Sequence, residues 1–196
     1  DGTGGRSTDN SGNTNGRNNT SPSNITISEN LIKVEWGQSY PYNIYVTQYN
    51  NNNAKTPTGC VPTALAQLMS YWKQPQQLSV PRKDGSGRTF NVLDWNKMLT
   101  FKTYISNYDL EKHKEAANQI AKLMESIGIN INTSYGTTGS SASDETAIKY
   151  LQSLGYITGS KLEYTKDRIL NSLYNKCPVF IVGYKTEKKV IGVPIK

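Results

Sequence analysis

One of the two cysteines, Cys60, stands where a glycine-containing turn passes into a strongly helical run, "TPTGCVPTALAQLMSYW" over residues 56–72. A thiol at a helix N-terminus faces unpaired backbone N–H groups and the positive end of the helix dipole, and both favour the thiolate. Such a thiolate could act as a nucleophile in covalent catalysis, provided that a general base completes the reaction. The alternative is a small side chain packed in a helix cap, because free cysteines are often buried.

The only histidine, His113, is the one candidate for that base within the chain. The spacing of apolar residues predicts a helix from Asp109 to Ile127, ended by Gly128, with His113 on its inner stripe. Helix position fixes the direction of the imidazole, and a histidine packed at the boundary of the core is more common than a catalytic one. We therefore expect His113 to pack at the boundary of the core, which leaves the chain without a recognised general base.

The second cysteine, Cys177, precedes Pro178 at the head of the apolar run "CPVFIVGYK" and has no capping or cationic neighbour. It is predicted to be a core or edge-strand residue. Two cysteines do not make a disulfide framework. Because a reactive Cys60 must be free, a Cys60–Cys177 disulfide and catalysis exclude each other.

The composition is that of a globular domain with a polar tail. The chain has 196 residues, of which 35% are hydrophobic, and its 13 Tyr and 3 Trp can help to fill a core. No apolar run approaches the roughly 20 residues that span a bilayer. The net charge of +7 comes from scattered Lys and Arg without an arginine-rich helix, which argues against nucleic-acid binding. We expect no nucleic-acid partner, no membrane span, no metal ion and no cofactor.

Residues 1–24 contain no aliphatic or aromatic side chain and are predicted to form a flexible linker or tail. The folded part is expected to begin near Ile25 with an alternating strand in "ITISENLIKVEW", followed by a turn-rich aromatic loop over residues 37–46. Four helices are predicted: over residues 60–72, over residues 109–127, after a cap at Ser143 or Asp144, and in "TKDRILNSLYNK". Residues 76–100 are predicted to be a loop with a short amphipathic turn in "NVLDWNKML". The run "CPVFIVGYK" is predicted to be a strand. Helices in the middle and strand at the far end favour an α+β architecture.

Four segments occur in the order and approximate spacing of one known family. They are "WGQSYPYN" at 36–43, "GCVPTALAQLMSYW" at 59–72, "DWNKML" at 94–99 and "SYGTTGSSAS" at 134–143. Over roughly residues 31–192 the chain resembles the streptopain family, which consists of secreted bacterial cysteine peptidases of papain-like fold. Because four segments agree in order, the resemblance is more specific than a lone Gly-Cys pair would be.

The resemblance implies a role for each matching residue. Cys60 corresponds to the catalytic nucleophile and Gln38 to the glutamine of the oxyanion hole, while Ser141, Ala142 and Gly59 correspond to the lining of the substrate cleft. Thiolate attack on a peptide carbonyl creates an oxyanion that needs two donors, and a Gln amide with the Cys60 N–H can supply them. Local sequence alone would instead make Gln38 a surface loop amide and residues 141–142 part of a flexible loop.

The chain departs from the family pattern in two places. Pro62 stands where the family usually has Ala, which is compatible with an opening helical turn. After "PVFIVGYK" the chain runs "TEKKVIGVPIK", without the family's Gly-His-Ala motif or its later Asn-Trp pair. The resemblance therefore implies an α+β papain-like fold with its helical half largely present and its C-terminal sheet half incomplete. Residues 25–196 would be a catalytic domain that lacks its C-terminal part.

Three interpretations follow from these observations. The favoured one is a cysteine endopeptidase whose general-base histidine lies beyond residue 196 and whose 196-residue chain is inactive alone. The others are a papain-like cell-wall amidase and an inactive papain-like binding or surface module. The favoured interpretation implies protein or peptide substrates, a propeptide as in a zymogen, a C-terminal fragment that completes the fold, and a bacterial location that is secreted or at the cell surface.

Overall fold

The structure, a computed structural model, describes residues 29–47, 53–136, 139–163, 165–184 and 189–196. The elements in chain order are α1 (Cys60–Trp72), β1 (Gln77–Pro81), β2 (Arg88–Val92), α2 (Trp95–Met98), α3 (Asn107–Lys112), α4 (Lys114–Asn130), β3 (Ser134–Tyr135), β4 (Ser140–Ser141), α5 (Asp144–Ser153), β5 (Leu162–Glu163), α6 (Lys166–Tyr174), β6 (Val179–Tyr184) and β7 (Lys189–Pro194). The architecture is α+β, as predicted. The predicted tail at residues 1–24 lies outside the described residues.

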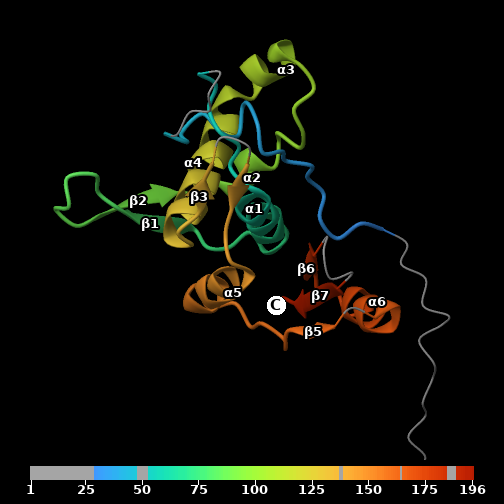
Figure 1. Ribbon diagram of the computed structural model, residues 1–196. Helices are drawn as coiled ribbons and strands as arrows, with labels where there is room; N and C mark the ends of the chain where they lie inside the picture. The colour runs from blue at the N-terminus through green and yellow to red at the C-terminus, as the bar shows by residue number, and fades with distance from the viewer. Residues whose placement is uncertain (1–28, 48–52, 137–138, 164, 185–188) are drawn as a thin grey trace, which may run out of the picture.

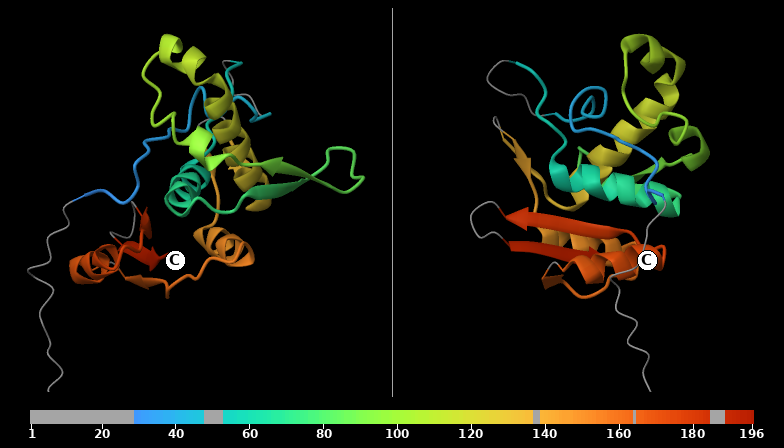
Figure 2. Two further views of the ribbon diagram at one scale, coloured as in Figure 1. Left: turned by 180° about the vertical axis from the view of Figure 1, so that it is seen from behind. Right: turned by 90° about the vertical axis from the view of Figure 1, so that its right-hand side faces the viewer.

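The chain forms two parts, shown in Figure 1. The helical part comprises the described residues up to Ser143 and is built around α1 and α4. The C-terminal part begins at Asp144 and holds α5, α6 and a three-stranded sheet. In the right-hand view of Figure 2, α1 lies between the rest of the helical part and this sheet. One hydrogen bond across the two parts runs from the Tyr71 hydroxyl to the Lys176 carbonyl oxygen, over 2.9 Å.

Helix α1 has the bounds that its apolar spacing predicts. Leu65 and Met69 lie one turn apart and are fully buried, which places the apolar stripe against the core. Pro62 occupies the first turn, where its missing N–H removes no helical bond. The helix ends at Lys73, whose φ of 52° is left-handed, two residues before Pro75.

The prediction of one continuous helix over residues 109–127 is wrong. The structure divides it at His113, where φ is −116°, into α3 and α4. Helix α4 also continues through Gly128 to Asn130, so the predicted end at this glycine is wrong as well. The apolar stripe itself is confirmed, since Ile120 and Met124 are fully buried against the core. A periodic stripe survives a change of helix axis, which explains why the sequence pattern did not reveal the break.

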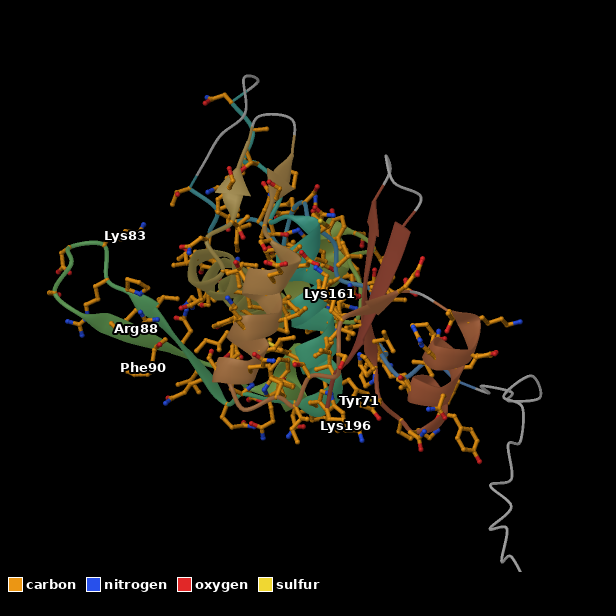
Figure 3. All side chains as sticks on the ribbon, turned by 60° about the horizontal axis from the view of Figure 1, so that its bottom comes forward. Tyr71, Lys83, Arg88, Phe90, Lys161 and Lys196 are labelled. Carbon is orange, nitrogen blue, oxygen red and sulfur yellow. The ribbon has the colours of Figure 1, made fainter. Side chains whose placement is uncertain are left out.

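Residues 76–100 are not the loop that was predicted, because they contain an antiparallel hairpin. Strand β1 pairs with β2 in a register that sets Ser79 opposite Phe90. Leu78 and Val80 on one face are buried, while Phe90 on the other face is exposed. Figure 3 shows this hairpin projecting from the body of the molecule, with the labelled Phe90 on it. The buried residues of β1 lie near α4, and this long-range packing stabilises a strand that its short pattern did not predict.

Residues 29–36 do not form the predicted strand, of which residues 25–28 lie outside the described part. The alternation of burial is nevertheless present, because Val34 and Trp36 are buried between exposed neighbours. The segment is held by isolated bonds rather than by a sheet. The Glu35 N–H donates to the Lys102 carbonyl over 2.8 Å, and the Trp36 indole N–H donates to the Phe101 carbonyl over 2.8 Å.

The C-terminal sheet has the order β5-β7-β6, and all its described pairs are antiparallel. Strand β6 confirms the predicted apolar strand, whereas β7 was not predicted. Phe180 stands opposite Val193, and both are buried. In the part of the chain that the structure describes, β6 pairs with β7 along one edge only. Ile181 on β6 is 47% exposed.

The predicted helix cap at the start of α5 is confirmed. Ser143 is the cap, and its hydroxyl oxygen accepts from the Thr146 N–H. The predicted helix in "TKDRILNSLYNK" is α6, capped by Thr165 in the same way. Among the described residues, no helix combines the length and the apolar character that crossing a membrane would require.

Candidate active site

Cys60 is the first residue of α1, and its side chain is exposed. The residue before it, Gly59, has a φ of 97° and a ψ of 151°, and no side chain caps the helix. The first turn of α1 contains no acidic residue. The thiol therefore lies at the positive end of the helix dipole. Among the described residues, no side chain accepts a capping hydrogen bond from the N–H groups of this helix start.

The loop that carries Gln38 lies against the residues before the cysteine. We call Lys55–Gly59 the pre-cysteine segment. The Thr58 N–H donates to the Gln38 carbonyl oxygen over 2.9 Å. The Asn43 side-chain amide donates to the carbonyls of Lys55 at 3.3 Å and Thr56 at 3.2 Å. The backbone of Gln38 is thus held by Thr58, which lies two positions before Cys60. Gln38 is exposed, so its side-chain amide remains accessible.

The same loop is anchored in the core by Tyr42. This side chain is buried and lies in van der Waals range of Gly37, where an added Cβ would be 3.4 Å from the ring. Burial raises the pKa of Tyr42 to about 12, against the smaller opposing effect of backbone hydrogen bonds. The Tyr42 hydroxyl therefore stays neutral at physiological pH, and the anchor does not change its charge there.

Strand β4 lies on the other side of the pre-cysteine segment. The Ser140 hydroxyl donates to the Pro57 carbonyl oxygen over 2.7 Å. A Cβ added at Gly59 would be 3.3 Å from the Ser140 Cβ, so the two backbones approach closely at this point. Ser141 is exposed and Ala142 is half-buried. The predicted site segments, 38, 59–60 and 141–142, are thus brought together around one short stretch of chain.

His113 lies elsewhere. Its Nδ1 is 3.0 Å from the Asp109 carbonyl oxygen and 3.4 Å from the Asp109 carboxylate, and its ring centroid is 6.0 Å from that of Phe101. The right-hand view of Figure 2 places the α3–α4 corner and β4 on opposite sides of the helical part. His113 is 30% exposed, as expected of a histidine at the boundary of the core, and its described contacts do not include Cys60.

Cys177 is a core residue, as predicted. It is 2% exposed, and its Sγ is 3.2 Å from the Ile195 carbonyl oxygen. Burial raises the pKa of the Cys177 thiol, which keeps it protonated. Both cysteines are free, so the Cys60–Cys177 disulfide that would exclude catalysis is not formed.

Sequence reasoning missed the hydroxyl and amide groups that hold the pre-cysteine segment. The Thr63 hydroxyl donates to the Gly59 carbonyl over 2.9 Å, and its oxygen is 3.0 Å from the Thr58 hydroxyl oxygen. Thr58 and Thr63 are both buried. Their positions, one directly before the Gly-Cys pair and one a turn after it, could have predicted this contact between the two threonines. No local signal points to Asn43 or Ser140, whose partners are distant in sequence.

The described residues contain no group of three or more His, Cys, Asp or Glu side chains placed to hold a metal ion. The chemistry that an exposed thiol at a helix N-terminus supports is nucleophilic attack.

Comparison with known proteins finds related sequences and structures. The model of the Peptidase C10 family matches residues 36–192. The thiol protease/hemagglutinin PrtT of Porphyromonas gingivalis is 26% identical over 169 residues, which cover 76% of this chain and 19% of that protein. The chain therefore spans about a fifth of the length of this curated relative.

Two solved structures are similar to the chain. The active wild-type interpain A cysteine protease of Prevotella intermedia superposes with a TM-score of 0.55 and 25% identity, covering 83% of this chain and 72% of that one. A prointerpain A fragment from the same organism gives a TM-score of 0.54 and 26% identity, with 74% and 50% covered. The likeness gives the chain the papain-like fold that its motifs implied. On its family match and its fold, the chain belongs to the Peptidase C10 family, the streptopain family.

Proposed function

We propose that this chain carries the nucleophile half of a cysteine endopeptidase. The observation that carries the proposal is the exposed Cys60 at the uncapped start of α1, between the Gln38 loop and β4. The Cys60 thiolate attacks the scissile carbonyl, the C–N bond breaks as the general acid–base protonates the leaving amine, and water then hydrolyses the acyl-enzyme to free the acid and regenerate the thiol. The Gln38 side-chain amide and the Cys60 N–H stabilise the oxyanion. Ser141, Ala142 and Gly59 line the cleft beside the substrate backbone.

The general base is a histidine supplied by sequence beyond residue 196. His113 is engaged with Asp109 and Phe101 away from the cysteine, and it is the only histidine in the 196 residues. The match covers 19% of PrtT and 72% of the interpain A structure, so both relatives contain residues outside the matched region. Residues 25–196 are then a catalytic domain without its C-terminal part, preceded by a linker at 1–24.

The C-terminal sheet supports the same proposal. Strand β6 has one described neighbour, and Ile181 is 47% exposed. A further polypeptide that pairs with β6 would cover this apolar surface and satisfy the strand edge. We propose that the C-terminal segment with the histidine completes the sheet in this way. A propeptide is a second expected partner, since one similar structure is a prointerpain A fragment, and secretion or display at the cell surface suits such a zymogen.

The inactive binding module remains the competing function, because the observed position of His113 leaves Cys60 without a described base. One experiment separates the two. Residues 1–196 and the full-length gene product are assayed on casein, each with a Cys60→Ala variant as control, after intact mass has defined both species. We expect cleavage only by the full-length form, and only with Cys60 present. No cleavage by either form would favour the binding module, whereas Cys60-dependent cleavage by residues 1–196 would place the base within them.

A further inference from the structure

The pre-cysteine segment is held by hydrogen bonds from three directions. In the Gln38 loop, the Gln38 carbonyl accepts from the Thr58 N–H, and the Asn43 side-chain amide donates to the carbonyls of Lys55 and Thr56. From α1 comes the Thr63 hydroxyl, which donates to the Gly59 carbonyl over 2.9 Å. From β4 comes the Ser140 hydroxyl, which donates to the Pro57 carbonyl over 2.7 Å. These bonds fix the turn from which Cys60 begins.

The Ser140 bond differs from the others because it links the segment to β4, the strand that the proposed function places beside the substrate. Its partners are 83 positions apart in sequence. Ser140 is half-buried and pairs with Tyr135 in the short β3-β4 ladder, directly before the exposed Ser141. Since β3 and β4 have two residues each, the ladder alone holds β4 weakly, and the bond to Pro57 is a large share of its attachment.

We propose that Ser140 is a positioning residue that couples β4 to the pre-cysteine segment. The proposal rests on the proposed function and adds a role that concerns neither attack nor direct substrate contact. The Ser140 hydroxyl holds the Pro57 carbonyl, the adjacent Thr58 N–H holds the Gln38 carbonyl, and Gly59 leads directly into Cys60. The consecutive residues Pro57, Thr58 and Gly59 therefore fix the positions of both proposed oxyanion donors and of β4, the proposed substrate strand, relative to one another.

The close approach of Gly59 and Ser140 makes this coupling sensitive to small displacements. Gly59, with φ at 97°, has no Cβ, and a Cβ added there would be 3.3 Å from the Ser140 Cβ and 3.4 Å from the Ser140 carbonyl oxygen, so the segment and β4 lie close together at this point. Loss of the Ser140 hydroxyl lets the segment move away, which misplaces the Cys60 N–H and the Gln38 amide. Because a small misplacement at a reacting centre slows the chemical step, we expect roughly a threefold to tenfold loss of kcat.

The test compares Ser140→Ala with a matched control in the full-length active protein. Ser153→Ala removes another hydroxyl that donates to a backbone carbonyl, that of Tyr150, over 2.7 Å at the end of α5. We expect Ser140→Ala to lower kcat with KM unchanged and with a melting temperature equal to that of Ser153→Ala. Ser140→Thr keeps a hydroxyl and should restore most of kcat. A rise in KM alone, or an unchanged kcat, would overturn the proposal.

A second readout does not depend on catalysis. Amide hydrogen exchange at Thr58, whose N–H donates to Gln38, reports how firmly the pre-cysteine segment is held. Ser140→Ala should accelerate this exchange, and Ser153→Ala should not. Equal exchange in the two variants would overturn the coupling. If the wild-type protein cleaves no substrate but the exchange at Thr58 responds to Ser140→Ala, the proposed function fails while the coupling stands.

Discussion

Helices α1 and α4 of the helical part and the elements α6 and β6 of the C-terminal part differ in how completely their apolar side chains are covered. Leu65 and Met69 of α1 and Met124 of α4 are fully buried. In the C-terminal part, Ile181 of β6 is 47% exposed, and none of the described residues of α6 is buried. Cys60, the proposed nucleophile, thus begins a helix whose apolar side is well covered. A thiol and its oxyanion donors need fixed geometry, whereas the surface beside β6 is available for another polypeptide.

The largest effect that tests this comparison is a pair of core truncations. Met124→Ala should lower the free energy of unfolding by about 2 to 5 kcal/mol, because it leaves a cavity in a fully covered core. Ile181→Ala should cost about 0.5 kcal/mol or less, as expected of an exposed side chain. Urea unfolding of both variants provides the measurement. Equal losses would mean that the face of β6 is as well covered as the core.

Next in size is the effect of the Gln38 amide on turnover. In the full-length protein, Gln38→Ala should lower kcat on the order of 100-fold to 1,000-fold, about 3 to 4 kcal/mol, and leave KM largely unchanged. Gln152→Ala, an exposed amide on α5 that donates to the Thr158 hydroxyl, is the control from the other part. Steady-state kinetics on an unfolded substrate checks both. Unchanged turnover in the Gln38 variant would make Gln38 a simple loop amide.

The two thiols allow the comparison to be made by chemistry. Cys60 is exposed at the start of α1, and Cys177 is 2% exposed, with burial raising its pKa. We expect iodoacetamide near neutral pH to alkylate Cys60 at least about tenfold faster, since Cys60 is accessible whereas Cys177 is buried and its raised pKa keeps it protonated. Peptide mapping after brief treatment identifies the labelled residue. Preferential labelling of Cys177 would contradict the assignment of Cys60 as nucleophile.

The smallest expected effect is an acid-dependent loss of stability in the C-terminal part. Burial alone would raise the pKa of Asp144, but Lys161, 2.6 Å away, and the backbone N–H groups outweigh burial and lower it below the ordinary value of 3.8. A lowered carboxyl pKa contributes stability that is present above pH 3.8 and lost as the pH falls through the lower folded value. We therefore expect Asp144→Asn to lose about 1 kcal/mol near pH 6 and less at pH 2.

Unfolding curves at the two pH values check this expectation, with Glu145→Gln as the control. Glu145 is 3.7 Å from the same lysine but is 73% exposed, so its variant should change little. A loss that is equal at both pH values would show that Asp144 acts without its charge, for example through the start of α5.

The elements that sequence predicted well are those whose signals are local. Helix α1 combines an apolar stripe, Pro62 in its first turn and a stop before Pro75, and each of these acts within a few residues. The cap at Ser143 is equally local. Cys60 and Gln38 were found through motifs rather than through periodicity, and the structure brings their segments together through the Thr58 bond.

The elements that sequence did not predict depend on distant partners. Strand β1 is specified by burial of Leu78 and Val80 near α4, and β7 by its pairing with β6. The break at His113 separates two helices that share one apolar stripe. The Ser140 bond joins residues 83 positions apart. Tertiary packing decided each of these, and a pattern read over a few turns does not contain it.

Gly128 has a consequence for anyone who would stabilise this protein. It lies inside α4, where exchanging glycine for alanine ordinarily stabilises a helix by about 1 kcal/mol. Here an alanine methyl would overlap the hydroxyl oxygen of Tyr135, the residue of β3 that stands opposite Ser140. The tyrosine side chain would have to move away from α4. A substitution chosen by helix propensity alone would therefore set a gain in thermal tolerance against a displaced Tyr135, a residue of the β3-β4 ladder.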